Sequence, residues 1–109
     1  MREGILRAIT MMSALILTAK AGRIAYGDHV ETWYNLDMSR VISRADQAIG
    51  LTDLYHVDER GVKMYGPWVI VAAHPSKVRY SRVQTSLGEG IILDTHTTDP
   101  EVYDIAVAW

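Results

Sequence analysis

The clearest hydrophobic pattern in the chain predicts an amphipathic helix near residues 37–50. Apolar side chains recur there at spacings of three and four residues, and polar side chains fill the positions between them. The apolar positions are Met38, Val41, Ile42, Ala45 and Ile49. Asp37 precedes them as a candidate N-cap, and Gly50 follows them as a C-terminal stop. We expect this stripe to pack on the rest of the domain, with Arg44 facing solvent.

After Gly50 the pattern changes to short apolar runs between turn residues, which is typical of β-strands. The run at residues 68–73 (WVIVAA) is continuously apolar and predicts a buried strand, and Pro75 ends it because proline cannot donate to a sheet. Two shorter pieces flank a turn at 58–61. In residues 78–86 apolar and polar positions partly alternate, which indicates a half-buried strand.

Two further strands are expected at GIILDT and YDIAVAW near the end of the chain. We expect a turn at 87–90, where two glycines flank Glu89, and an exposed lead-in at 22–34, where no period is visible. Several short strands and one helix predict a mainly β domain of the α+β class, or a small barrel. No repeat or linker divides residues 22–109, so they are expected to form a single domain.

Residues 1–21 have the pattern of a secretory signal peptide. Arg2 and Arg7 precede an apolar run at 8–19, and Ala19-Lys20-Ala21 has the small-x-small form of a cleavage site. The run is too short to span a bilayer, which takes about 20 apolar residues. The alternative is an N-terminal helix buried in the domain. The signal-peptide interpretation places the protein outside the cell or at the cell wall.

Composition narrows the possible functions. The chain has 109 residues and a net charge of −2, which lacks the basic footprint of a nucleic-acid-binding protein. It has no cysteine, which excludes disulfides, a thiolate nucleophile and cysteine-based zinc sites. The four histidines show no tight ligand spacing. We therefore expect no metal, no cofactor and no nucleic-acid partner. We also expect the protein to be a monomer.

Several short motifs, in a fixed order, carry a family resemblance. They are YNL at 34–36, GVKM at 61–64, VIVAA at 69–73, SLGEGI at 86–91, DT at 94–95 and DIA at 104–106. In this order the chain resembles small exported or phage-borne proteins of Gram-positive bacteria. These are similar to the 3D domain, which is named for three aspartates. The resemblance implies a six-stranded, double-psi-like β-barrel over residues 22–109, related to the barrel of peptidoglycan-cleaving proteins.

The resemblance also implies which residues act. Asp94 and Thr95 match the Asp-Thr of the 3D domain, and Asp104 matches its last aspartate. The first aspartate has no counterpart, because Ala72 or Ala73 stands in its place. His96 replaces a glycine, where it either narrows the approach of a substrate or supplies a polar group of its own.

Asp94 and Asp104 are accordingly the candidate catalytic pair, for lytic-transglycosylase-like cleavage of peptidoglycan glycan strands. Such cleavage needs a carboxyl that acts as acid and then as base. Asp94 follows the apolar residues 91–93, and apolar surroundings favour the protonated form of an acid. We expect Asp94 to be the acid/base and Asp104 to support it.

The candidate substrate-binding residues are Thr95, His96, Trp68, Tyr80 and Arg79. Aromatic rings stack on sugar rings, and a guanidinium pairs with the carboxylates of peptidoglycan. The alternative function is a non-catalytic module, either wall-binding or a phage structural domain. In that interpretation Asp94 and Asp104 only hold turns at strand ends.

Overall fold

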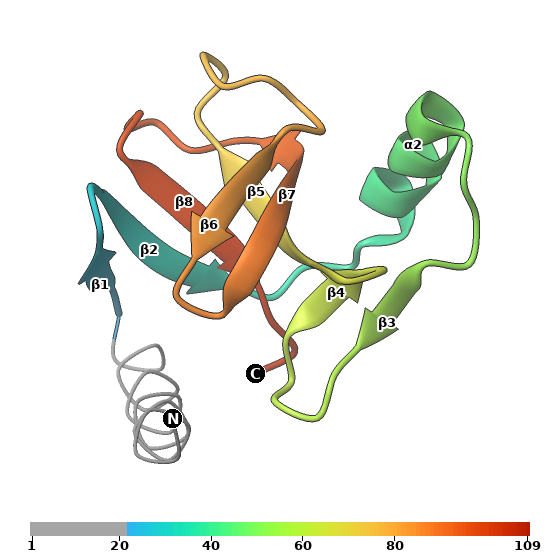
Figure 1. Ribbon diagram of the computed structural model, residues 1–109, viewed down its shortest axis with the longest axis horizontal. Helices are drawn as coiled ribbons and strands as arrows, with labels where there is room; N and C mark the ends of the chain where they lie inside the picture. The colour runs from blue at the N-terminus through green and yellow to red at the C-terminus, as the bar shows by residue number, and fades with distance from the viewer. Residues whose placement is uncertain (1–21) are drawn as a thin grey trace, which may run out of the picture.

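The computed structural model describes residues 22–109, which form one mixed β-sheet and one helix (Figure 1). The strands are β1 (Ile24–Tyr26), β2 (His29–Tyr34), β3 (Tyr55–Val57), β4 (Lys63–Tyr65), β5 (Trp68–Ala73), β6 (Arg82–Thr85), β7 (Gly88–Thr95) and β8 (Val102–Ala106), and the helix is α2 (Ser39–Ile49). The mainly β class with one packed helix is confirmed. Eight strands pair where six were expected. The signal peptide or helix expected at 1–21 lies outside the described residues.

Two parallel strand pairs form the centre of the sheet. Strand β2 pairs in parallel with β8, strand β5 pairs in parallel with β7, and β5 joins the two pairs through antiparallel contacts with β8. In Figure 1, β6 and β7 lie in front of β5 and β8, so the sheet folds over itself. The apolar core between these layers consists of Val62, Met64, Val69, Val71, Ala73, Leu87, Ile92, Ile105 and Val107. This core holds the carboxyl end of β7 against β5 and β8.

Strand β5 is apolar at every position because it is covered on both faces. Val69, Val71 and Ala73 face the core between the layers, while Ile70 belongs to a second cluster beneath α2. The second cluster is formed by Met38, Val41, Ala45, Tyr65, Ile70, Ile91, Leu93 and Ala106. A strand buried on both faces lacks the alternation of a half-exposed strand. The strand predicted at 68–73 is therefore found with the expected bounds.

The helix packs through the predicted stripe. Met38, Val41 and Ala45 are buried, and Gly50 ends the helix in the left-handed conformation (φ 82°) with its N–H bonded to the Asp46 carbonyl. The N-terminus differs from the expectation. Asp37 is not the N-cap, because the helix begins at Ser39; its carboxylate instead accepts the N–H and the hydroxyl of Ser39.

Three loop and strand predictions are corrected by the structure. Residues 22–34 are the β1–β2 hairpin rather than an exposed lead-in, and β2 is an interior strand of the sheet. The β6–β7 turn lies at Ser86–Leu87, since β7 already begins at Gly88. Within 78–86 only Arg82–Thr85 is strand. Tyr80 has φ 71°, a left-handed conformation that does not fit a strand.

Candidate functional site

The sheet register brings Asp94 and Asp104 to the two sides of one residue. Ala72 on β5 pairs with Asp94 on β7 and with Asp104 on β8. Directly opposed residues point their side chains to the same face of a sheet. Of the two alanines expected to replace a first aspartate, Ala72 therefore lies between the two carboxylates, whereas Ala73 faces the core.

A register shift in β7 aims Asp94 at this face. Val71 pairs with Ile92, but the next residue, Ala72, pairs with Asp94, so Leu93 is skipped. A bulge of this kind redirects the side chain that follows it. Leu93 and Asp94 consequently both reach the helix side of the sheet: Leu93 packs beneath α2, and Asp94 contacts Arg44.

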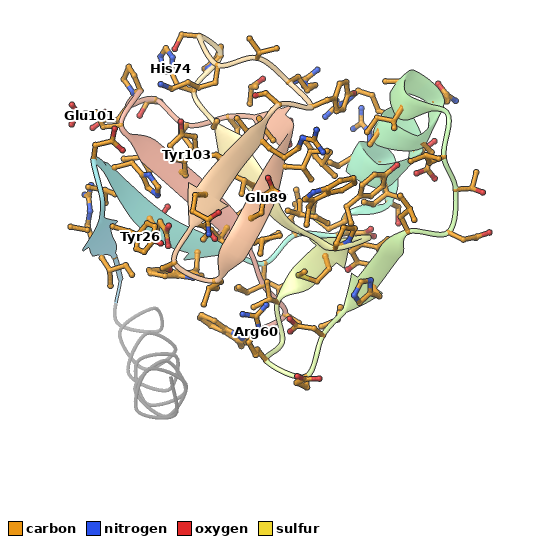
Figure 2. The ribbon with its side chains drawn as sticks, in the orientation of Figure 1. Tyr26, Arg60, His74, Glu89, Glu101 and Tyr103 are labelled. Atoms are coloured by element: carbon orange, nitrogen blue, oxygen red, sulfur yellow. The ribbon has the colours of Figure 1, made fainter. Side chains whose placement is uncertain are left out.

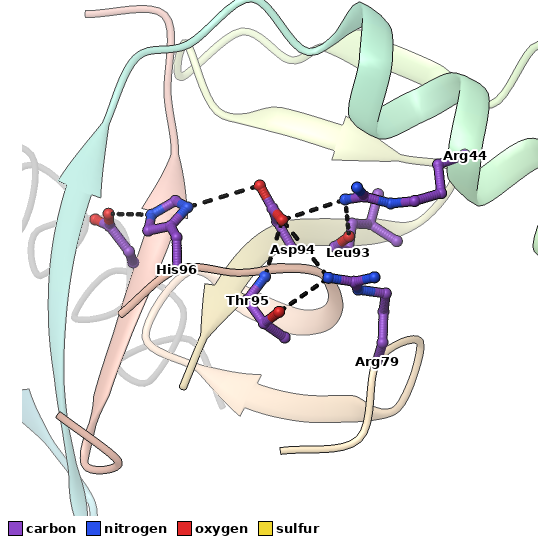
Figure 3. A network of polar contacts seen from close by, with 7 residues as sticks. Arg44, Arg79, Leu93, Asp94, Thr95 and His96 are labelled. Carbon is purple, nitrogen blue, oxygen red and sulfur yellow. Dashed lines mark hydrogen bonds and ion pairs between the residues drawn. The ribbon is translucent and has the colours of Figure 1, made fainter. Parts of the chain in front are cut away.

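Asp94 is held by donors on three sides (Figure 3). Its Oδ1 lies 3.2 Å from Arg44 Nη2 and 3.8 Å from Arg79 Nη2, and it accepts the Thr95 N–H at 2.9 Å. Arg44 also donates to the Leu93 carbonyl, and Arg79 donates to the Thr95 hydroxyl at 2.9 Å. The expected apolar surroundings of Asp94 are therefore wrong. Its neighbours are cationic and polar.

His96 links Asp94 to Asp104. Its Nδ1 lies 3.6 Å from Asp94 Oδ2, and its Nε2 lies 3.0 Å from Asp104 Oδ2. The Thr32 hydroxyl donates to the other oxygen of Asp104 at 2.8 Å. The contacts thus run from Asp104 through His96 and Asp94 to the two arginines. Figure 3 shows the part from His96 through Asp94 to Arg44 and Arg79.

Tyr34 completes the site from β2. Its ring meets the His96 ring edge-on, with centroids 4.9 Å apart. Its hydroxyl is buried and has no hydrogen-bond partner among residues 22–109. Burial raises the pKa of Tyr34, and the charges of Asp104 and Asp94 raise it further. The phenol is therefore a neutral group beside two carboxylates.

Asp104 faces an open hollow of about 250 Å³, whereas Asp94 does not line it. The hollow is lined by Thr32, His96, Thr97, Thr98, Asp99, Val102 and Asp104. Its walls are rich in hydroxyl groups rather than aromatic rings. Hydroxyl groups both donate and accept hydrogen bonds, as the hydroxyls of a sugar do.

The structure brings together five of the seven residues expected at the site. Asp94, Thr95, His96, Asp104 and Arg79 share the network, but the two aromatic candidates lie elsewhere. Trp68 is four residues along β5 from Ala72, about 13 Å away for an extended strand, and it contacts Arg82 and Glu89. Tyr80 packs against the cluster beneath α2.

Sequence reasoning did not identify Arg44, Thr32 or Tyr34 as parts of the site. Arg44 is exposed, as expected, but it also bonds to residues 49 and 50 positions away along the chain. Thr32 lay in the segment interpreted as a lead-in. For Tyr34 a signal existed, because it begins the YNL motif, but nothing local indicates that it meets His96.

Residues 22–109 contain neither a candidate metal site nor a membrane-spanning helix. No group of three or more His, Asp or Glu side chains is arranged to hold a metal ion in this part of the chain. No helix in the same residues is long and apolar enough to cross a bilayer.

The chain was also compared with known proteins. No protein-family model, no curated protein and no solved structure matches it. The resemblance to the 3D domain therefore remains a prediction from the motifs.

Proposed function

We propose that the protein cleaves peptidoglycan glycan strands, with Asp104 as the acid/base. One observation carries this proposal. Both side chains that contact Asp104, the Thr32 hydroxyl and the His96 imidazole, can donate or accept a hydrogen bond. They can hold Asp104 when it is protonated and when it is ionised. A carboxyl that acts first as acid and then as base needs such partners.

Asp94 has different surroundings. His96 Nδ1 lies 3.6 Å from it, but its other partners, the guanidinium groups of Arg44 and Arg79 and the Thr95 N–H, only donate and suit a carboxylate. This difference favours the reverse of the roles expected from sequence. Asp104 is the acid/base, and Asp94 positions His96.

The reaction follows from these roles. Protonated Asp104 gives its proton to the glycosidic oxygen as the bond from that oxygen to the sugar C1 breaks. The ionised Asp104 then takes the proton of the sugar's own 6-hydroxyl, whose oxygen bonds to C1 and closes a 1,6-anhydro ring. The carboxylate that forms on Asp104 favours the positive charge that develops on the sugar in the transition state. Asp104 ends protonated, ready for another cycle.

The substrate class rests on two supports. The motif resemblance points to peptidoglycan through Asp94-Thr95 and Asp104. The hydroxyl-lined hollow beside Asp104 offers partners for sugar hydroxyls. The test is incubation of the purified protein with cell walls, followed by mass spectrometry of the soluble products. Anhydro-muropeptides are expected; hydrated ends would show hydrolysis instead.

The second candidate is a non-catalytic wall-binding module. It is favoured by the ion pairs of Asp94 with Arg44 and Arg79, which have the form of a structural network, and by Ala72 in place of a third carboxylate. Co-sedimentation of the protein with cell walls, without any soluble product, would support this function over cleavage.

A further inference from the structure

A buried lysine lies apart from the acidic site. Lys63 on β4 is only 7% exposed, and its Nζ donates to Asn35 Oδ1 at 2.7 Å and to the Leu36 carbonyl at 2.6 Å. Both acceptors are neutral. No carboxylate of residues 22–109 forms an ion pair with it. Burial lowers the pKa of Lys63, and the charge of Asp37 opposes that change.

Buried charges in proteins are normally paired, because an unpaired charge loses hydration without compensation. An ammonium group has three N–H donors, and two of those on Lys63 are used. One donor thus remains for another partner, and within residues 22–109 the charge is offset only by Asp37, which lies beyond ion-pair distance.

A hollow of about 340 Å³ lies at this lysine, and its lining comes from the start of α2 and from strands β3 and β4. It is lined by Leu36, Asp37, Met38, Ser39, Ile42, Tyr55 and Lys63. Leu36 and Tyr55 are large apolar side chains that remain 46% and 38% exposed. The Asp37 carboxylate is already bonded to the N–H and hydroxyl of Ser39.

We propose that this hollow binds a monocarboxylate with a short apolar chain. The carboxylate pairs with Lys63, and the apolar chain covers Leu36 and Tyr55. A free peptide C-terminus with an apolar side chain has this chemistry, and so does a branched short-chain acid. The proposal does not depend on glycan cleavage, since no side chain of the Asp94–His96–Asp104 network lines this hollow.

The test is an NMR titration of the ¹⁵N-labelled full chain with N-acetyl-leucine, 4-methylpentanoate and the neutral N-acetyl-leucinamide. We expect the carboxylates to shift the amide signals of Leu36, Tyr55 and Lys63, with a Kd of about 1 mM for ligands of this size. The amide should bind at least about tenfold more weakly. Tighter binding of N-acetyl-leucine than of 4-methylpentanoate would identify a peptide terminus, and equal binding would identify a simple acid.

Lys63→Met should abolish binding of both carboxylates. Lys77→Met is the control, because Lys77 lies over the Tyr103 ring in another part of the molecule, and it should bind like the wild type. If Lys63→Met does not fold, Leu36→Glu at an exposed position should weaken binding through like-charge repulsion. Equal affinity for N-acetyl-leucinamide, no shifts at these amides, or unchanged binding in a folded Lys63→Met or Leu36→Glu protein would overturn the proposal.

Discussion

Two histidine–carboxylate pairs lie on opposite faces of β2 and differ mainly in their exposure to solvent. On the inner face, His29 Nε2 lies 2.9 Å from Glu31; on the outer face, His96 Nε2 lies 3.0 Å from Asp104. Glu31 is fully buried and His29 is 8% exposed, whereas His96 is 39% exposed. The same bond is thus enclosed on one face and open on the other.

The inner pair has further partners, and only the Asp28 carboxylate, 3.9 Å from His29 Nδ1, is fully exposed among those of residues 22–109. Glu31 also accepts the N–H and the hydroxyl of Ser86, which ties β2 to the β6–β7 turn. The His29 ring packs against Tyr103 and Tyr26, at centroid distances of 4.7 and 5.7 Å. The two tyrosines are labelled in Figure 2. The outer pair lines a hollow and lies beside the Tyr34 phenol, which has no hydrogen-bond partner among residues 22–109. We therefore propose that the Glu31 cluster stabilises the fold and that the Asp104 cluster carries the chemistry.

The largest effect on stability is expected at the inner pair. Glu31→Ala leaves His29 and both Ser86 donors without their buried acceptor. Breaking a buried charge network by removing one partner costs about 3–5 kcal/mol. Urea unfolding followed by tryptophan fluorescence measures the loss. Glu101→Ala, at an exposed carboxylate, is the control and should change stability by less than about 0.5 kcal/mol. Equal losses in the two variants would remove the distinction between the clusters.

Asp94→Asn should have a smaller effect on stability. It removes the ionic contacts with Arg44 and Arg79. The side chains of these arginines are 44% and 35% exposed. Exposed ion pairs contribute at most about 1 kcal/mol, and salt screens them. The difference between variant and wild type should shrink as salt is added to the unfolding assay. A loss as large as that of Glu31→Ala would show that the outer cluster is structural.

The smallest effect is expected at Tyr34. Its hydroxyl makes no hydrogen bond within residues 22–109, so Tyr34→Phe should leave Tm unchanged or raise it slightly. The matched control is Tyr65→Phe, because the Tyr65 hydroxyl donates to Asp46 at 2.7 Å. The control should lose about 1 kcal/mol of stability. Equal losses of Tm would show that the Tyr34 hydroxyl has a structural partner.

The elements with strong local patterns could be predicted from the sequence. The apolar stripe at 38–49 has the period of a helix, and the run at 68–73 is continuously apolar. The helix and the strand that they predict were both found. Strand β2 was missed because its buried positions His29 and Glu31 are polar, which hides the alternation of a strand. The turn at Ser86–Leu87 was expected slightly too late, at 87–90, because it contains no glycine. It is held by Thr85, whose hydroxyl accepts the Leu87 N–H and donates to the Gly88 carbonyl.

The site was predicted only in part, for a related reason. Asp94 and Asp104 stand at the ends of recognisable strands, and the motifs singled them out. Their partners come from distant segments: Arg44 from α2 and Thr32 from β2. No local pattern predicts contacts between residues 50 or 72 positions apart. The distinction between a carboxylate paired with two guanidinium groups and one held by a hydroxyl and an imidazole therefore required the structure.

The proposed acid/base is Asp104 rather than Asp94. The direct measurement is the rate at which anhydro-muropeptides are released from purified cell walls by the wild type, Asp104→Asn and Asp99→Asn. Asp99 lines the same hollow and serves as the matched control. We expect Asp104→Asn to lose about 10²–10⁴-fold in rate, the usual contribution of a general acid, with little change in Tm. Asp99→Asn should stay close to the wild type. Release at the wild-type rate by a folded Asp104→Asn protein would contradict the assignment.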